Sequence, residues 1–310
     1  MSIEVRCLII ALSLFSCTAF NQISLNSLFG QQTSKSPAQL KTVAITGASG
    51  LVGSALKKKL ESRNIKVLSI GRNSGNDADS IQWDLANGIT DLKKLENVDA
   101  IVHLAGEGVA SGSGALSLLG RWDGDKKDKI LGSRVIGTKL IVDALSKLKK
   151  KPGLFISASA VGYYPYNSDT NTVYTESSSK GEGFLADVCE QWEQEALQAD
   201  KLGIRTVCTR FGIILSSNGG ILKKLLPLFQ VGGGGVIGSG KQGFSAVSIN
   251  DAVNALDYIL TNYKSKADLK GVVNVCSPQP TDNEGFTKAF GRYVDLYTLC
   301  TLLYTLTRLK

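Results

Sequence analysis

Three glycines separate a short apolar run from a helical segment near residue 50. The apolar run is Val43 to Thr46, the glycines are Gly47, Gly50 and Gly53, and the helical pattern covers residues 51–62. The first glycine permits a tight turn, the second lets the backbone approach a pyrophosphate, and the third lets the helix pack against the strand. The phosphates then lie at the positive end of the helix dipole. This order of strand, glycine loop and helix predicts a dinucleotide site, with a plain surface loop as the alternative.

Residues after the next strands indicate which dinucleotide binds. A second apolar run, 65–70, is followed by Gly71 and Arg72, at the place where the adenosine ribose would lie. An acid there would bind the 2′-hydroxyl of NAD, whereas Arg72 offers a cation to a 2′-phosphate. The sequence therefore favours NADP(H) over NAD(H), the alternative for Arg72 being a solvated loop residue. Asp84 ends a short strand at 81–84 where it could meet adenine, and Ala105 and Gly106 follow the strand at 99–104.

Composition excludes several other classes of protein. The chain has 310 residues, 43% hydrophobic and 20% charged, which is ordinary for a globular protein with one large α/β domain or one such domain plus a small lobe. The net charge of +8 is scattered over separate lysine groups without interleaved aromatic residues, so we expect no nucleic-acid partner. A single histidine, His103, and six cysteines without metal-ligand spacing predict no metal site.

Residues 1–41 have the pattern of a targeting presequence. Arg6 precedes an apolar run at 7–15, and small residues follow at 16–19, as in a secretory signal peptide. The stretch 21–41 is polar, rich in Ser and Gln and poor in acids, as in a transit peptide. The two together resemble presequences that reach plastids through the secretory route. We expect a plastid location, with plain secretion as the alternative. The apolar C-terminal stretch is too short and too interrupted by polar residues for a stable membrane span.

Strand-like and helix-like segments alternate through the rest of the chain. Such alternation predicts an α/β fold with a parallel sheet and helices on both faces. Strands are expected at 155–159 and 204–210, and long helices at 126–150 and 183–201. A polar loop at 164–180 and a glycine-dense one at 232–240 are each either a substrate lid or a simple connection.

The motifs occur in the order of a known family. TGASGLVG, HLAGEGV, SRVIGT, SASAVGYY, FLADVCEQWE, RFGIIL and NVCSPQPTDNEGF resemble the extended short-chain dehydrogenase/reductases, and within them an atypical epimerase-like branch that includes chloroplast proteins. The resemblance implies a Rossmann-type, doubly wound NAD(P)-binding domain at 42–215 and a small C-terminal substrate lobe at 216–291, interleaved with the core. Residues 292–310 depart from the family, as a truncated gene end would. The two long helices could pair two subunits into a homodimer or serve as ordinary core.

The resemblance also implies site residues. Ser159 matches the catalytic serine, with Ser157 as second choice, and Arg134 falls on the central helix beside the site. The cofactor positions are Gly47, Ser49, Gly50, Leu51, Val52 and Gly53 in the glycine loop, Arg72, Asp84, and Leu104, Ala105 and Gly106 after the central strand.

One departure from the family leaves the reaction open. The usual Tyr-x-x-x-Lys pair is replaced by Leu185 and Cys189, or, if the alignment shifts by one residue, has Phe184 at its first position. None of these side chains can do the proton chemistry of that pair. Tyr163 or Tyr164 is the candidate substitute acid, and Lys180 could approach the site. The sequence thus supports two functions: an NADP(H)-dependent oxidoreductase or nucleotide-sugar epimerase with a small polar substrate, or a non-catalytic nucleotide-binding sensor or scaffold in the plastid. The family resemblance links the second function to organelle division.

Overall fold

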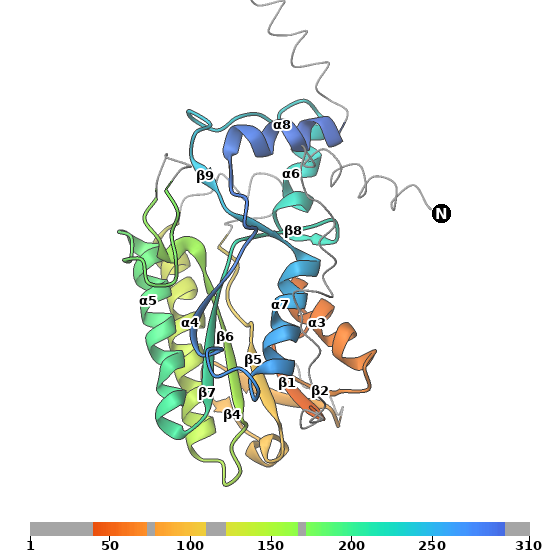
Figure 1. Cartoon of the computed structure of the whole chain (residues 1–310), viewed down its shortest axis with the longest axis vertical. Helices are drawn as coiled ribbons and strands as arrows, with labels where there is room; N and C mark the ends of the chain where they lie inside the picture. Colours follow the sequence, from red (N-terminus) through yellow and green to blue (C-terminus); the bar gives the residue numbers. More distant parts are fainter. Residues whose placement is uncertain (1–39, 73–77, 110–121, 167–171, 295–310) are drawn as a thin grey trace, which may run out of the picture.

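The computed structural model describes residues 40–72, 78–109, 122–166 and 172–294 (Figure 1). The predicted presequence at 1–41 lies outside these ranges except for its last two residues. The predicted divergent tail at 292–310 lies outside them except for its first three residues.

A central eight-stranded sheet has the order β11-β7-β6-β5-β1-β2-β3-β4. All neighbouring strands are parallel except β3 and β4, which are antiparallel. The switch in strand order between β1 and β5 is where doubly wound sheets bind ligands. The predicted Rossmann-type fold is therefore confirmed. The strands are β1 (Thr42–Thr46), β2 (Lys66–Gly71), β3 (Ser80–Asp84), β4 (Gly88–Ile89), β5 (Ala100–His103), β6 (Leu154–Ala160), β7 (Arg205–Phe211) and β11 (Gly271–Val275).

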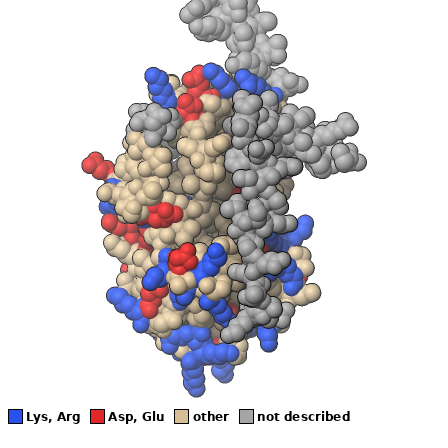
Figure 2. Space-filling view, in the orientation of Figure 1, with Lys and Arg blue, Asp and Glu red and all other residues tan. Residues whose placement is uncertain are grey.

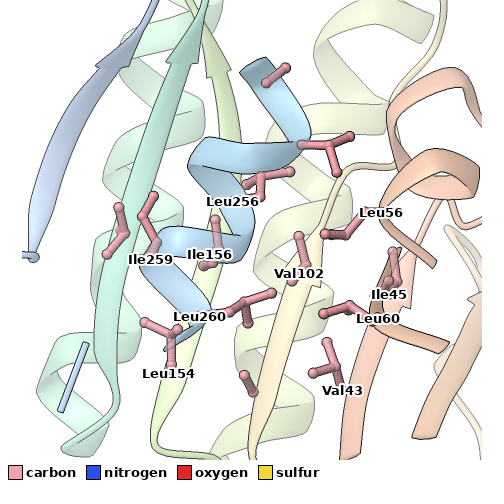
Figure 3. Close-up of a cluster of buried hydrophobic side chains, with 14 of the residues drawn as sticks. Val43, Ile45, Leu56, Leu60, Val102, Leu154, Ile156, Leu256, Ile259 and Leu260 are labelled. Carbon is pink, nitrogen blue, oxygen red and sulfur yellow. The ribbon is translucent and has the colours of Figure 1, made fainter. Parts of the chain in front are cut away.

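Helices cover both faces of this sheet (Figure 1). On one face α3 (Leu51–Glu61) and α7 (Ile249–Asn262) form a core with alternate residues of the strands, such as Val43, Ile45 and Val102 (Figure 3). On the other face lie α4 (Gly124–Ser146) and α5 (Phe184–Leu197), packed over Ala44 and Ile101 among others. Because successive residues of a strand point to opposite faces, both of which are covered, the strands are nearly continuous apolar runs.

A smaller lobe lies beyond the C-terminal ends of the strands (Figure 1). Its aromatic side chains pack together: the rings of Phe244 and Phe286 stack with centroids 4.2 Å apart, and Phe229 and Phe290 meet edge to face with centroids 4.8 Å apart. The chain enters this lobe twice, since α7 and β11 return to the main sheet in between. The elements of the lobe are β8 (Ile213–Ser216), α6 (Gly220–Gln230), β9 (Gly243–Phe244), β10 (Ala246–Ser248), β12 (Thr281–Asp282) and α8 (Asn283–Tyr293).

The boundaries of the two long helices differ from the predicted ones by a few residues. The helix expected at 126–150 begins at Gly124, because the Asp123 carboxylate accepts a hydrogen bond from the backbone of Lys126 and caps it. The helix expected at 183–201 ends at Leu197 and continues as a 3₁₀ turn, η4 (Gln198–Leu202). Short 3₁₀ turns also occur as η1 (Leu92–Leu95) and η3 (Val161–Tyr163).

The surface carries mixed charge. Figure 2 shows acidic side chains interspersed with the basic ones over much of one face. The exposed lysines at 147 and 149–151 lie where α4 leads into β6, at the N-terminal edge of the sheet and away from the switch point. Within the described ranges no helix is long and apolar enough to cross a membrane.

Candidate active site

The glycine loop brings β1, α3 and the end of β5 into direct contact. Gly47 has a φ of +66°, and a Cβ built on it would lie 3.0 Å from the backbone nitrogen of Ala105 and 3.1 Å from the carbonyl oxygen of Leu104. A Cβ on Gly53 would lie 2.2 Å from the carbonyl oxygen of Gly47. Since no real Cβ tolerates that distance, only glycine lets α3 start this close to β1.

The N-terminus of α3 is suited to bind an anion. Gly50 is its N-cap, no side chain of the described residues caps it, and its first turn holds no acid. Lys58 and Lys59 occupy the last turn, where cations complement the helix dipole. Ser49 and Gly50 are exposed, and Leu51 and Val52 are partly buried. Backbone N–H groups at such a terminus fit a pyrophosphate, so this loop meets the requirements of a dinucleotide.

A buried bond fixes the end of β5 against β1. The hydroxyl oxygen of Thr46 accepts hydrogen bonds from the backbone of Leu104 at 3.0 Å and Ala105 at 3.1 Å. It lies 2.7 Å from Nδ1 of His103, to which it can donate its own proton. Burial lowers the pKa of His103 to about 4, so the ring is neutral at physiological pH. Thr46 was not predicted as a site residue, although a polar residue at the end of an apolar run was a usable signal.

Arg72 lies at the predicted ribose end of the site. It follows β2 directly and is exposed, and among the described residues it forms no ion pair. Its positive charge interacts with the carboxylate of Glu107, just beyond β5. The bond from Lys126, 2.7 Å long, lowers the pKa of the Glu107 carboxyl, and the charge of Arg72 acts in the same direction. Arg72 thus lies near the switch point with its charge available.

Asp84 lies at the end of β3, but its carboxylate is largely engaged locally. Oδ1 accepts hydrogen bonds from the backbone of Ala86 at 2.9 Å and Asn87 at 2.7 Å. These bonds and the side chain of Asn87 lower the pKa of the Asp84 carboxyl. Asp84 therefore shapes the β3–β4 turn, and any adenine contact would have to share its oxygens.

Ser159 begins a buried polar network on the other side of the switch point. Its side-chain hydroxyl, on a residue only 3% exposed, donates a 2.5 Å hydrogen bond to Oε1 of Glu193 on α5. Arg210 on β7 then donates from Nε to Oε1 and from Nη2 to Oε2 of the same carboxylate, each at 2.7 Å. Ser157, the second choice, is fully buried and donates to the carbonyl of Ala158.

Two tyrosines surround the same guanidinium. Nη1 of Arg210 donates to the hydroxyl of Tyr164 at 2.9 Å, and that hydroxyl donates to Oδ1 of Asn274 on β11 at 2.6 Å. The ring of Tyr163 lies on the guanidinium, with the central carbon 3.4 Å from the ring centroid. The pKa of Arg210 is raised, because these bonds to Glu193 and Tyr164 outweigh the effect of burial, which alone would lower it.

The α5 positions that usually hold the Tyr-Lys pair have no such chemistry here. Leu185 lies beside Gly162, and Cys189 lies near Ser159, with its pKa raised by burial to about 11. Lys180 is bound to Asp187 at 2.7 Å and Glu190 at 2.9 Å, and these bonds raise its pKa. Lys180 is therefore a protonated partner of the α5 surface.

The structure gathers most of the predicted residues at the C-terminal edge of the sheet. The glycine loop, Arg72 and the end of β5 lie on one side, and Ser159 with Tyr163 on the other. Glu193 and Arg210 were missed as site residues, although a charged residue at the end of an otherwise apolar strand was a signal for Arg210. Within the described ranges, no cluster of three or more His, Cys, Asp or Glu side chains could hold a metal ion.

Comparisons with known proteins agree with this geometry. A family model described as "NAD dependent epimerase/dehydratase family" matches residues 43–276. An epimerase family protein of Mycobacterium bovis, Mb2239, is 38% identical over 253 residues, which are 82% of this chain and 79% of that protein. The chloroplastic SDR39U1 homolog of Arabidopsis thaliana is 34% identical over 247 residues, covering 77% of this chain and 67% of that protein.

A solved structure extends the comparison. The human epimerase family protein SDR39U1 (isoform 2), crystallised with NADPH, has a TM-score of 0.68 and 30% identity, covering 82% of this chain and 80% of that one.

Proposed function

The chain belongs to the NAD dependent epimerase/dehydratase family, and we propose that it binds NADP(H) and catalyses oxidoreduction or epimerisation of a small polar substrate. The observation that carries the proposal is the glycine loop, in which Gly47 and Gly53 leave no room for a side chain beside an uncapped helix terminus.

Arg72 supports the preference for NADP(H). It is an exposed cation at the tip of β2, where a 2′-phosphate would lie, and that position holds no acid to bind a 2′-hydroxyl. The human relative crystallised with NADPH is consistent with this choice.

We assign two tasks to the residues of this chain: transferring a proton and orienting the substrate. A bound nicotinamide would supply or accept a hydride. Because Ser159 donates its own proton to Glu193, its oxygen can accept a hydrogen bond from a substrate hydroxyl. Tyr163 is the proposed proton donor or acceptor. The charge of Arg210 against its ring stabilises negative charge that develops there during proton transfer, which is the role that the lysine of the usual pair plays.

Calorimetric titration with NADPH and NADH tests the cofactor. We expect NADPH to bind at least tenfold more tightly than NADH, and Arg72→Glu to remove the difference. Lys147→Glu is the matched control, since it makes the same change of charge at the opposite edge of the sheet. A folded protein that binds neither nucleotide would overturn the proposal.

A binding role without catalysis is the second candidate. It is favoured by the burial of Ser159 and by Leu185 and Cys189 at the positions of the usual catalytic pair. A screen of aldehydes, ketones and nucleotide sugars separates the two candidates. Turnover that Ser159→Ala abolishes supports the enzyme, whereas tight NADPH binding with no turnover in the screen supports a sensor or scaffold.

We also propose a plastid location, from the sequence pattern of residues 1–41 and from the word chloroplastic in the name of the Arabidopsis relative. Fusing this segment to a fluorescent protein tests the proposal. Import into plastids is the expected result, and secretion would contradict it.

A further inference from the structure

The guanidinium of Arg134, on α4, lies beside two surfaces. A Cβ built on Gly106, just after β5, would lie 3.5 Å from the central carbon of the guanidinium and 3.6 and 3.7 Å from its terminal nitrogens. These nearly equal distances place the guanidinium face over the backbone of Gly106. The ring of Trp192 on α5 is the second surface, with its centroid 5.3 Å from the central carbon. The guanidinium therefore packs against the loop after β5 and beside Trp192, while its edge carries the N–H donors.

This cation has no counterion among the described residues. One terminal nitrogen donates to the carbonyl of Ile130 at 3.1 Å, and no carboxylate lies within ion-pair distance. Glu107, the nearby acid, is paired with Lys126 at 2.7 Å. Cys189 cannot serve as a thiolate, because burial raises its pKa to about 11.

Leaving such a charge unpaired is costly. Burial lowers the pKa of Arg134, which reports the penalty that desolvation places on its charged form. Arg134 is partly buried and the charge of Glu107 offsets part of this penalty, so the cation remains incompletely compensated until another negative charge arrives. An anion that arrives with a ligand would supply the missing partner.

The location of Arg134 connects it with the proposed active site. Gly106 belongs to the segment predicted to face the cofactor, and Cys189, which lies close to Arg134, also lies next to Ser159. The guanidinium therefore lies close to both the end of β5 and the Ser159 network, beside the proposed active site.

We propose that Arg134 binds an oxyanion of the substrate, a carboxylate or a phosphate ester, so that the protein acts on acidic small molecules. The planar fork of a guanidinium matches two oxygens of either group. This inference rests on the proposed function, because it names the class of substrate that would bind at the same active site.

Thermal unfolding of the purified protein tests the inference. The probes are sodium malonate and inorganic phosphate, compared with sodium chloride at equal ionic strength, each with and without saturating NADP⁺. For the wild type we expect Tm to rise with malonate or phosphate beyond the chloride control, both with and without NADP⁺. For Arg134→Gln we expect no such rise, whereas Arg63→Gln, which changes an exposed arginine near the opposite edge of the sheet, should respond like the wild type.

The outcomes separate this inference from the proposed function. A wild type that responds to the anions but not to NADP⁺ keeps the anion site and refutes the cofactor. An anion response that disappears when NADP⁺ is bound, with weaker NADP⁺ binding by Arg134→Gln, would assign Arg134 to the cofactor and overturn the inference. Equal responses of wild type and Arg134→Gln overturn it as well.

A second variant keeps the test valid if Arg134→Gln does not fold. Arg134→Lys retains the positive charge but loses the planar fork. Its dissociation constant for the anion, taken from the concentration dependence of Tm, should rise at least tenfold. An unchanged constant would contradict the proposed role of the guanidinium.

Discussion

Arg210 and Glu193 form a bidentate ion pair inside the protein, with two nitrogen–oxygen distances of 2.7 Å and exposures of only 3% and 5%. The pair joins β7 to α5, and Ser159 donates to the same carboxylate. Because both charges are removed from water, each depends on the other. This pair therefore controls both the packing of α5 and the environment of the proposed catalytic serine.

Breaking this pair should destabilise the protein strongly. We expect Glu193→Gln to lower the free energy of unfolding by about 3–5 kcal/mol, since it leaves Arg210 buried without a counterion. Urea denaturation followed by circular dichroism measures the change. Glu284→Gln is the control, because it breaks an exposed pair with Lys288 and should cost about 0.5 kcal/mol or less. Equal costs for the two variants would contradict the prediction.

The two adjacent tyrosines should respond differently to loss of the hydroxyl. Tyr163→Phe keeps the ring over Arg210 but removes the proposed proton donor, so we expect turnover to fall about 100-fold or more with little change in stability. Tyr164→Phe removes a hydroxyl bound to Arg210 and Asn274 and should cost about 1–3 kcal/mol of stability. Turnover of a substrate found by the screen and denaturation of both variants provide the comparison. Full activity of Tyr163→Phe would remove that residue from the mechanism.

A single methyl group in the glycine loop should disturb the fold. Gly53→Ala places its Cβ 2.2 Å from the carbonyl oxygen of Gly47, so α3 must move away from β1. We expect a loss of about 1–3 kcal/mol of unfolding free energy and weaker NADPH binding. Gly124→Ala is the matched control, since its Cβ meets nothing within 4 Å and the residue begins a helix. If calorimetry and denaturation show the same values for both variants, the close approach of α3 to β1 is not required.

His103 should make the protein less stable in acid. Its pKa in the folded state is about 4, below the ordinary value of 6.5, so the unfolded chain takes up a proton first as pH falls. The contribution of neutral His103 to the free energy of unfolding is fully present above pH 6.5 and is lost as the pH falls toward 4. The total loss should be about 3 kcal/mol.

The pH dependence of unfolding of His103→Gln provides the control. The variant retains a polar group beside Thr46 but cannot titrate in this range, and His103 is the single histidine of the chain. The difference in slope between wild type and variant from pH 4 to 6.5 isolates the histidine. Identical slopes would show that His103 is not buried in its neutral form.

Local patterns in the sequence predicted the structure of the glycine loop and the elements on either side of it. The run from Thr42 to Gly53 specifies a strand, a turn and a helix start from neighbouring residues alone, because glycine conformation and hydrophobic alternation act over a few residues. Arg72 could be placed at the second strand tip for the same reason. The parallel sheet with helices on both faces followed from the alternation of strands and helices, because parallel strands need crossover connections.

Long-range contacts formed the part of the candidate site around Ser159. Ser159, Glu193, Arg210 and Asn274 come from four elements spread over more than a hundred residues, and only the folded sheet brings them together. The return of α7 and β11 to the main sheet also depends on tertiary packing, because the sequence of an apolar helix or strand does not specify which surface it will pack against. The sequence motif of Arg134 predicted that it lies near the site. That it forms no ion pair with the described residues is visible only in the tertiary structure.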